Sequence, residues 1–179
     1  FKLDGGAFEY ASRGVTSDAI TLGEFDLMGG SSTIRVNPGS TGTGGFGVGT
    51  LNLGGAFTRT TGSTVTFVSG AGVMGANPYI KAADTTLTTN TNGIIGGWAT
   101  VNSMDGTTAA ANVEFATYDA VNGIRQLNLV EQVVTMAAAN AASNVRFSGT
   151  QTMLAGGQTI NSLTMNGAAS TLNFASNAD

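Results

Sequence analysis

The acid and base chemistry open to this sequence depends almost entirely on carboxylates. The 179 residues include no His and no Cys, but 11 Asp and Glu and 7 Lys and Arg. Without His or Cys there is no Ser-His-Asp or Cys-His nucleophile, no zinc site built from those side chains and no disulfide. A catalytic site would therefore need paired carboxylates, as in glycoside hydrolysis.

The strongest candidate group lies between residues 79 and 120, where aromatic and acidic residues gather. Carboxylates that act on a glycan are normally accompanied by aromatic or basic residues that contact the sugar, so a glycan-binding or glycan-cleaving site is one interpretation. The other is that the rings pack an inserted loop against the rest of the protein. The candidate residues are Trp98, Tyr79, Tyr118, Asp84, Asp105 and Asp119.

Two further patterns favour structural interpretations. Glu24 and Asp26 share one side of a predicted strand, opposite Phe25 and Leu27. This indicates a solvated outer face, although a glycosidase pair on a β-helix would look the same. Residues 42–47 match the dinucleotide fingerprint Gly-x-Gly-x-x-Gly, but a predicted strand follows where the motif needs a helix, which favours a flexible corner.

Cofactors are not expected, and metal binding has only a weak candidate. The sequence has no EF-hand loop and no Gly-Gly-x-Gly-x-Asp run, so calcium is considered only at Asp105 and neighbouring turns. No residue is assigned a catalytic role, and the protein is not expected to be an enzyme.

Charge and hydropathy exclude several partners. The formal net charge is −4 and the cationic residues are thinly spread, so nucleic acid is not expected. No apolar stretch approaches the ~20 residues of a membrane helix. The slightly positive mean hydropathy of +0.14 indicates a folded chain. The start at Phe1, with neither Met nor a signal-peptide pattern, suggests a processed or partial chain.

An internal repeat gives the clearest information on architecture. Each copy places apolar residues before one or two glycines and a Ser-Thr-containing segment after them, and the first two copies superpose without a gap. The copies are residues 22–36, residues 160–174, residues 48–67 with residues 57–61 as an inserted bulge or loop, and a half copy at residues 124–129.

Apolar and polar residues alternate within each copy, which predicts short, half-buried strands. Paired glycines between them indicate corners that need positive φ or close backbone approach. We therefore predict an all-β fold: residues 1–179 form a single parallel β-helix (β-solenoid) segment of about seven or eight coils, with a divergent, decorated coil or insertion near residues 79–120. The side chains expected to face its bore are Phe25, Leu27, Ile34, Leu163, Met165 and Leu172.

Two points of this prediction stay open. The Ala-rich residues 135–142 are compatible with a helical turn, but strand-like segments on both sides favour a loop between coils. A β-sandwich is the alternative fold.

Three segments resemble the autotransporter-associated β-strand repeat proteins, which are long secreted or surface polypeptides of bacteria. The first is the repeat at residues 22–34, the second the Asn-Gly-Ile-Ile-Gly-Gly-Trp-Ala-Thr run at 92–100, and the third the Glu-Phe-Ala-Thr-Tyr-Asp run at 114–119 with Gly123-Ile124. The resemblance implies a parallel β-helix passenger, an extracellular or cell-surface location, a structural or adhesive use and no catalytic residues to transfer.

These observations predict a mechanical role. The chain is expected to be a rigid spacer, coat or fibre subunit of a bacterial surface or an extracellular filament, in contact with copies of itself or with the rest of a longer polypeptide. A cell-surface glycan is a further partner to consider. The alternative is a β-helix protein that binds or cleaves polysaccharide.

Overall fold

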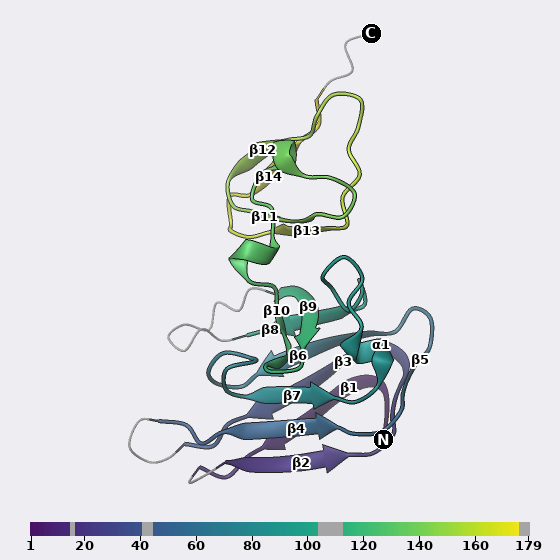
Figure 1. Cartoon of the computed structure of the whole chain (residues 1–179), viewed down its shortest axis with the longest axis vertical. Coiled ribbons are helices and arrows are strands. Elements are labelled where there is room, and N and C mark those ends of the chain that lie inside the picture. Colours follow the sequence, from purple (N-terminus) through teal and green to yellow (C-terminus); the bar gives the residue numbers. More distant parts are fainter. Residues whose placement is uncertain (15–16, 41–44, 104–112, 176–179) are drawn as a thin grey trace. The chain divides into compact units, whose positions relative to one another are not determined.

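The computed structural model describes residues 1–14, 17–40, 45–103 and 113–175 (Figure 1). Strands dominate these residues, so the predicted all-β class is confirmed. None of the described helices is long and apolar enough to span a membrane. The elements are β1 (Lys2–Ala11), β2 (Asp18–Leu22), β3 (Phe25–Asn37), β4 (Gly49–Leu53), β5 (Phe57–Arg59), β6 (Thr64–Ser69), β7 (Tyr79–Ala82), α1 (Thr85–Thr88), β8 (Ala99–Asn102), β9 (Val113–Asp119), β10 (Gly123–Gln126), the 3-10 turns η1 (Leu129–Glu131) and η2 (Met136–Ala138), β11 (Asn144–Phe147), β12 (Thr150–Thr152), β13 (Ser162–Met165) and β14 (Thr171–Asn173).

The chain divides by its contacts into two compact units. The N-terminal unit is Phe1–Gln126 and the C-terminal unit is Leu127–Asp179. The finer prediction, a single β-solenoid over residues 1–179, stays a prediction.

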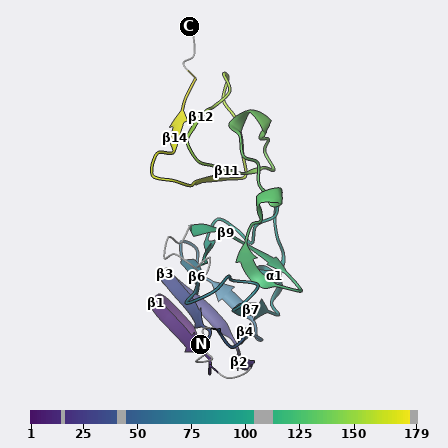
Figure 2. The ribbon, with the colours of Figure 1, turned by 90° about the vertical axis from the view of Figure 1, so that its left-hand side faces the viewer.

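The N-terminal unit contains two rows of parallel strands between which the chain alternates. One sheet has the order β1-β3-β6-β8, with β5 also paired to β3, and the other has the order β2-β4-β7. Figure 1 shows β2, β4 and β7 lying side by side, and Figure 2 shows β1, β3 and β6 edge to edge. Each return to a sheet therefore adds a strand beside the previous one.

Equivalent side chains lie level with each other across these parallel strands. Ile34 of β3 pairs with Phe67 of β6, which pairs with Val101 of β8, and all three are fully buried. In the second sheet Leu51 pairs with Ile80, also fully buried. Both sheets contribute to one hydrophobic cluster, so the predicted alternation places the apolar face of each strand in a shared core.

Residues 79–120 follow the parallel pattern at first and then leave it. β7 and β8 pair in parallel with β4 and β6. β9 then runs antiparallel to β8, and β10 antiparallel to β9. The divergence expected in this region is therefore located after β8.

Glycines allow close turns of the backbone in the two ways that the sequence suggests, within β3 at Gly30 and between β4 and β5 at Gly55. Gly30 adopts a left-handed φ of 59°, which costs little without a Cβ. Gly55 has ordinary φ, but a Cβ there would lie 2.5 Å from the carbonyl carbon of Gly23. The second corner therefore lies directly against the backbone of the preceding turn of the chain.

The third repeat copy is registered differently from the prediction. Phe57, Thr58 and Arg59 form β5, paired in register with residues 25–27 of β3, so the segment interpreted as an insertion is itself a rung of the sheet. Phe67 lies level with Ile34, where the gapped superposition placed Val65. The superposition was wrong because β4, which it matched to the start of β3, pairs with β2 instead.

The C-terminal unit has two short parallel pairs, β11-β13 and β12-β14. Its buried cluster contains Met136, Val145 and Phe147, with Leu163 and Leu172 partly buried against it. Met165 is 44% exposed, so its predicted place in the bore is wrong: β13 is an edge strand, and no later strand covers it in the described residues. Phe25, Leu27 and Ile34 are buried as predicted.

The Ala-rich residues 135–142 contain only the single 3-10 turn η2, and irregular backbone continues to β11. Met136 of this turn is buried while its Ala neighbours are exposed or partly exposed. The segment is thus a loop, held by the buried Met136 side chain and by hydrogen bonds between its backbone and the side chains of Gln151 and Gln158.

Candidate functional site

Trp98, the aromatic residue central to the predicted glycan site, is the last ring of a stack. Its ring centroid lies 5.5 Å from that of Phe57, Phe57 lies 5.6 Å from Phe25, and Phe25 lies 5.7 Å from Phe1. Interplanar angles of 13° to 18° make all three contacts stacked. We call these four residues the aromatic ladder. It forms because the parallel register of β3 and β5 places Phe57 beside Phe25.

A cation also contacts Trp98. The guanidinium carbon of Arg59 lies 5.0 Å from the Trp98 ring centroid, and Arg59 donates to the backbone oxygen of Ser63 at 3.0 Å. The Trp98 side chain is only partly exposed, because Phe57 and Arg59 both contact it. The Trp98 ring and the Arg59 guanidinium therefore both have partners within the protein.

Asp84 acts as the cap of α1 and as a link between turns of the chain. Its Oδ1 accepts from the Thr86 backbone N–H at 2.8 Å, and its Oδ2 accepts from the Phe57 N–H at 3.2 Å. The Thr86 hydrogen bond is the largest cause of the lowered pKa of Asp84, and the bond from Phe57 adds to it. A shallow depression beside this carboxylate is lined by Gly54, Gly55, Ala56, Ala83 and Asp84.

Replacement of Asp84 by Ala should lower the free energy of unfolding by about 1 to 2 kcal/mol, because two backbone N–H groups lose their acceptor. Asp84→Asn, which keeps one carbonyl acceptor, should lose less. Urea unfolding of the two variants measures the difference. Equal stability of Asp84→Ala and the unmodified chain would contradict the capping role.

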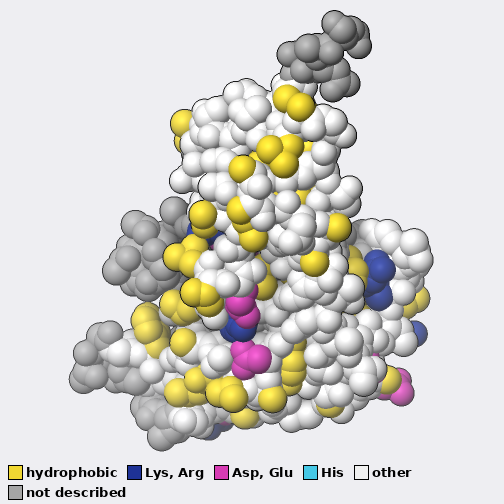
Figure 3. Space-filling view, turned by 45° about the horizontal axis from the view of Figure 1, so that its top comes forward, with side chains coloured by type: hydrophobic (Ala, Val, Ile, Leu, Met, Phe, Trp, Pro, Cys, Tyr) yellow, Lys and Arg dark blue, Asp and Glu magenta, His cyan; other side chains and the backbone are white. Residues whose placement is uncertain are grey.

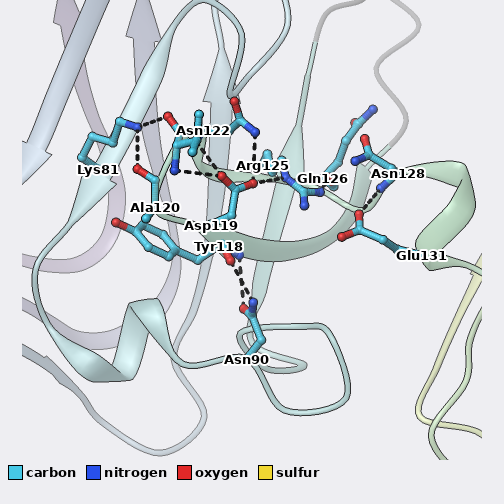
Figure 4. Close-up of polar contacts among 11 residues, drawn as sticks. Lys81, Asn90, Tyr118, Asp119, Ala120, Asn122, Arg125, Gln126, Asn128 and Glu131 are labelled. Carbon is cyan, nitrogen blue, oxygen red and sulfur yellow. Dashed lines mark hydrogen bonds and ion pairs between the residues drawn. The ribbon is translucent and has the colours of Figure 1, made fainter.

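Asp119 closes the hairpin between β9 and β10 (Figure 4). Its Oδ1 accepts from the backbone N–H groups of Val121 and Asn122 at 3.0 and 2.7 Å. Its Oδ2 accepts from the Asn122 side-chain amide at 3.1 Å and from Nε of Arg125 at 2.6 Å. Partial burial opposes ionisation, but the hydrogen bonds from Arg125 and Asn122 prevail and lower the pKa of Asp119 to about 2.

This lowered pKa predicts acid sensitivity in the N-terminal unit. Because the folded pKa is below the ordinary 3.8, ionised Asp119 stabilises the fold above about pH 4, and this stability is lost as the pH falls toward 2. The Asp119 side chain is 32% exposed, so we expect about 1 to 2 kcal/mol. Urea midpoints between pH 7 and pH 2.5 should converge for the unmodified chain and Asp119→Asn. Parallel pH profiles of the two proteins would refute the assignment.

Tyr118 lies in the hairpin itself, and Tyr79 is connected to the hairpin through Lys81. Tyr118 donates its hydroxyl to the Ala82 carbonyl at 3.1 Å, and its backbone N–H and carbonyl both bond to the side chain of Asn90. Lys81 lies 5.1 Å from the ring centroid of Tyr79 and donates to the carbonyls of Ala120 and Val121. Figure 4 shows the Lys81 ammonium directed at the turn.

The structure therefore brings the predicted residues together only in part. Asp84 and Trp98 are linked through Phe57, and Tyr118 reaches Ala82, two residues before Asp84. Asp105 lies outside the described residues. Asp84 and Asp119 both accept hydrogen bonds from donors of the protein itself, which is typical of carboxylates with structural roles.

Sequence reasoning missed three cations and an amide that organise this region: Arg59, Lys81, Arg125 and Asn90. A signal for Arg125 was present. The Asn122-Gly123 turn predicts a hairpin, and a tight hairpin brings residues 119 and 125 close together. For the others the sequence holds no comparable signal, because their partners are 28 or more residues away or lie on another strand.

The remaining candidates give no assembled site. Residues 42–44 of the glycine motif lie outside the described residues, and the next element after it is strand β4. Within the described ranges, no three acidic, His or Cys side chains cluster closely enough to hold a metal ion. Glu24 is exposed and Asp26 half-buried, opposite buried Phe25 and Leu27, as expected of an outer face.

The comparisons with known proteins find no match. No family model, no curated protein and no solved structure matches the chain. The resemblance to autotransporter-associated repeats therefore stays a prediction.

Proposed function

We propose that this chain is a β-solenoid segment with a mechanical role, a rigid spacer, coat or fibre subunit on a bacterial surface or in an extracellular filament. The observation that supports the proposal most strongly is the alternation of the chain between two parallel sheets, with like side chains stacked on like. Phe57 lies on Phe25, Phe67 on Ile34, and Thr66 on Thr100.

Stacking of this kind suits a protein with small side chains and few charges. Each new strand satisfies the backbone groups of the previous one and covers its apolar side chains, so a narrow core is enough. The hydroxyl groups of Thr66 and Thr100 lie 3.0 Å apart on the outer face of β6 and β8, which adds a hydrogen bond between rungs. On the face drawn in Figure 3, uncharged polar groups and backbone predominate.

The polar contacts of the aromatic and acidic residues also favour a structural role over glycan chemistry. The ladder rings stack on each other, and Asp84 and Asp119 hold backbone N–H groups. These contacts stabilise the fold without any ligand. They supply no pair of free carboxylates around a cleft, which hydrolysis would require.

Proteolysis combined with glycan binding tests this function. Proteinase K should leave a fragment containing β1 to β8 intact under conditions that digest the urea-unfolded chain completely. A panel of bacterial polysaccharides should show neither saturable binding nor cleavage. Rapid digestion of the folded chain would contradict the mechanical role, and glycan binding abolished by Asp119→Ala or Asp105→Ala would replace it with the polysaccharide alternative.

A further inference from the structure

Two strand edges at opposite ends of the chain have no partner among the described residues. β1 pairs only with β3, while β13 and β14 pair only with β11 and β12. All of these pairings are parallel. An unpaired edge presents backbone donors and acceptors that another parallel strand can satisfy.

The sequence at one edge matches the strand that β1 already uses as its partner. Residues 160–174 superpose without a gap on residues 22–36, most of which form β3. Leu3, Phe8 and Tyr10 of β1 lie level with Leu27, Ile34 and Val36. Rungs of a parallel stack repeat the same positions, so the corresponding positions at the free edge are Met165, Leu172 and Phe174.

Exposed apolar side chains coincide with this register. Met165 is 44% exposed and Phe174 is 76% exposed at the β13 and β14 edge. At the β1 edge Phe1 is 45% exposed, although its ring stacks on Phe25. In the matched register Phe1 lies over Leu163, Leu3 over Met165, and Tyr10 over Phe174, so large apolar residues meet at each of these three positions.

We infer that a second copy of this chain docks head to tail, with its β1 laid in parallel along β13 and β14 of the first copy. This inference rests on the proposed function, and it names a second copy of the chain as the partner of the fibre subunit. Because each docked copy again offers a free β13 and β14, the contact is heterologous and repeats from one copy to the next. Lys2 of the incoming copy is then level with Thr164, as it is level with Asp26 within its own chain.

Cysteine cross-linking tests the register in a chain that has no Cys of its own. Two single variants of the full chain, Lys2→Cys and Thr164→Cys, are mixed and oxidised mildly. Adjacent parallel positions are within disulfide reach, so the mixture should give a mixed dimer as the main product. The matched control replaces Thr164→Cys with Val130→Cys, whose side chain is 93% exposed but outside the edge strands. Equal cross-linking in the control would overturn the inference.

Failure of docking and failure of the solenoid can be told apart by an internal pair. Lys2→Cys with Asp26→Cys in one chain should close an intrachain disulfide, since the two residues are paired on the adjacent parallel strands β1 and β3. Closure of this pair without the mixed dimer would overturn docking and leave the solenoid standing. If the internal pair fails to close, the proposed stacking is itself wrong.

Sedimentation velocity gives an independent measure of self-association. Phe174→Asp should weaken it by about tenfold or more, because a charge replaces an apolar contact at the interface. Val130→Asp introduces the same charge at a more exposed site of the same unit and should leave self-association unchanged. A monomer at every concentration for the unmodified chain, or equal effects of the two variants, would contradict the inference.

Discussion

Replacement of Phe57 by Ala is expected to lower the free energy of unfolding of the N-terminal unit by about 3 to 5 kcal/mol. The Phe57 side chain is 6% exposed and stacks on Phe25 at one side and on Trp98 at the other. Its loss leaves a cavity and removes two aromatic contacts together. Urea unfolding followed by far-ultraviolet circular dichroism measures the change.

The control for this prediction is Phe46→Ala, the same chemical change at a ring that is 48% exposed. We expect it to cost less than about 1 kcal/mol. A similar cost at Phe46 and Phe57 would mean that the ladder does not hold the rungs together. A small cost at Phe57 alone would place that ring outside the core.

Replacement of Gly55 by Ala is expected to cost about 1 to 3 kcal/mol, although it adds a single methyl group. The new Cβ would lie 2.5 Å from the Gly23 carbonyl carbon and 2.6 Å from the Glu24 nitrogen. Both are backbone atoms of the preceding corner, so they cannot move aside as a flexible side chain would. The corner at Gly54-Gly55 therefore packs so closely on the corner at Gly23-Glu24 that a Cβ has no room.

Gly97→Ala provides the matched control, because a Cβ at Gly97 meets nothing within 4 Å and its φ is not left-handed. Its stability should stay within about 1 kcal/mol of the unmodified chain or rise, since Ala restricts the unfolded state more than Gly does. Thermal midpoints of both variants check the pair. Equal midpoints would contradict close stacking of the corners.

Alternation along the sequence was sufficient to predict the all-β class and the buried face of β3, whereas β1 was not located from the sequence. Phe25, Leu27 and Ile34 alternate with polar or small residues, and any pleated strand with one buried face requires that spacing. The exposure of Met165 could not be predicted in the same way. A strand's inward side chains are covered only if another strand follows, and the repeat pattern carries no information about which copy stands at an edge.

The pairing register between strands was harder to predict from the sequence than the positions of the strands. The third repeat copy could be superposed on the first only by treating residues 57–61 as an insertion, yet Phe57 is the residue that lies on Phe25. Apolar positions two residues apart face the same side of a strand, so a slip of two preserves the pattern and cannot be detected from it. The loops between strands differ in length, which removes the fixed period that would have resolved the choice.

The candidate site illustrates the same limit at the level of single residues. The sequence groups Asp84, Asp119, Tyr118 and Trp98 as candidates between residues 79 and 120, but their partners depend on the fold. Asp84 caps a helix of four residues and also bonds to Phe57, which is 27 residues earlier in the chain. Residue type alone does not distinguish a carboxylate that accepts hydrogen bonds from backbone N–H groups from one that would bind a substrate.

Stacking of successive turns of the chain is tested most directly by nuclear Overhauser effects from the Phe67 ring in the isotopically labelled protein. Phe67 lies level with Ile34 on one neighbouring strand and with Val101 on the other. The account predicts strong effects from the ring to the methyl groups of both residues, 33 and 34 positions away in the chain. A ring that contacts neither residue, or methyl contacts arranged as in antiparallel sheets, would contradict it.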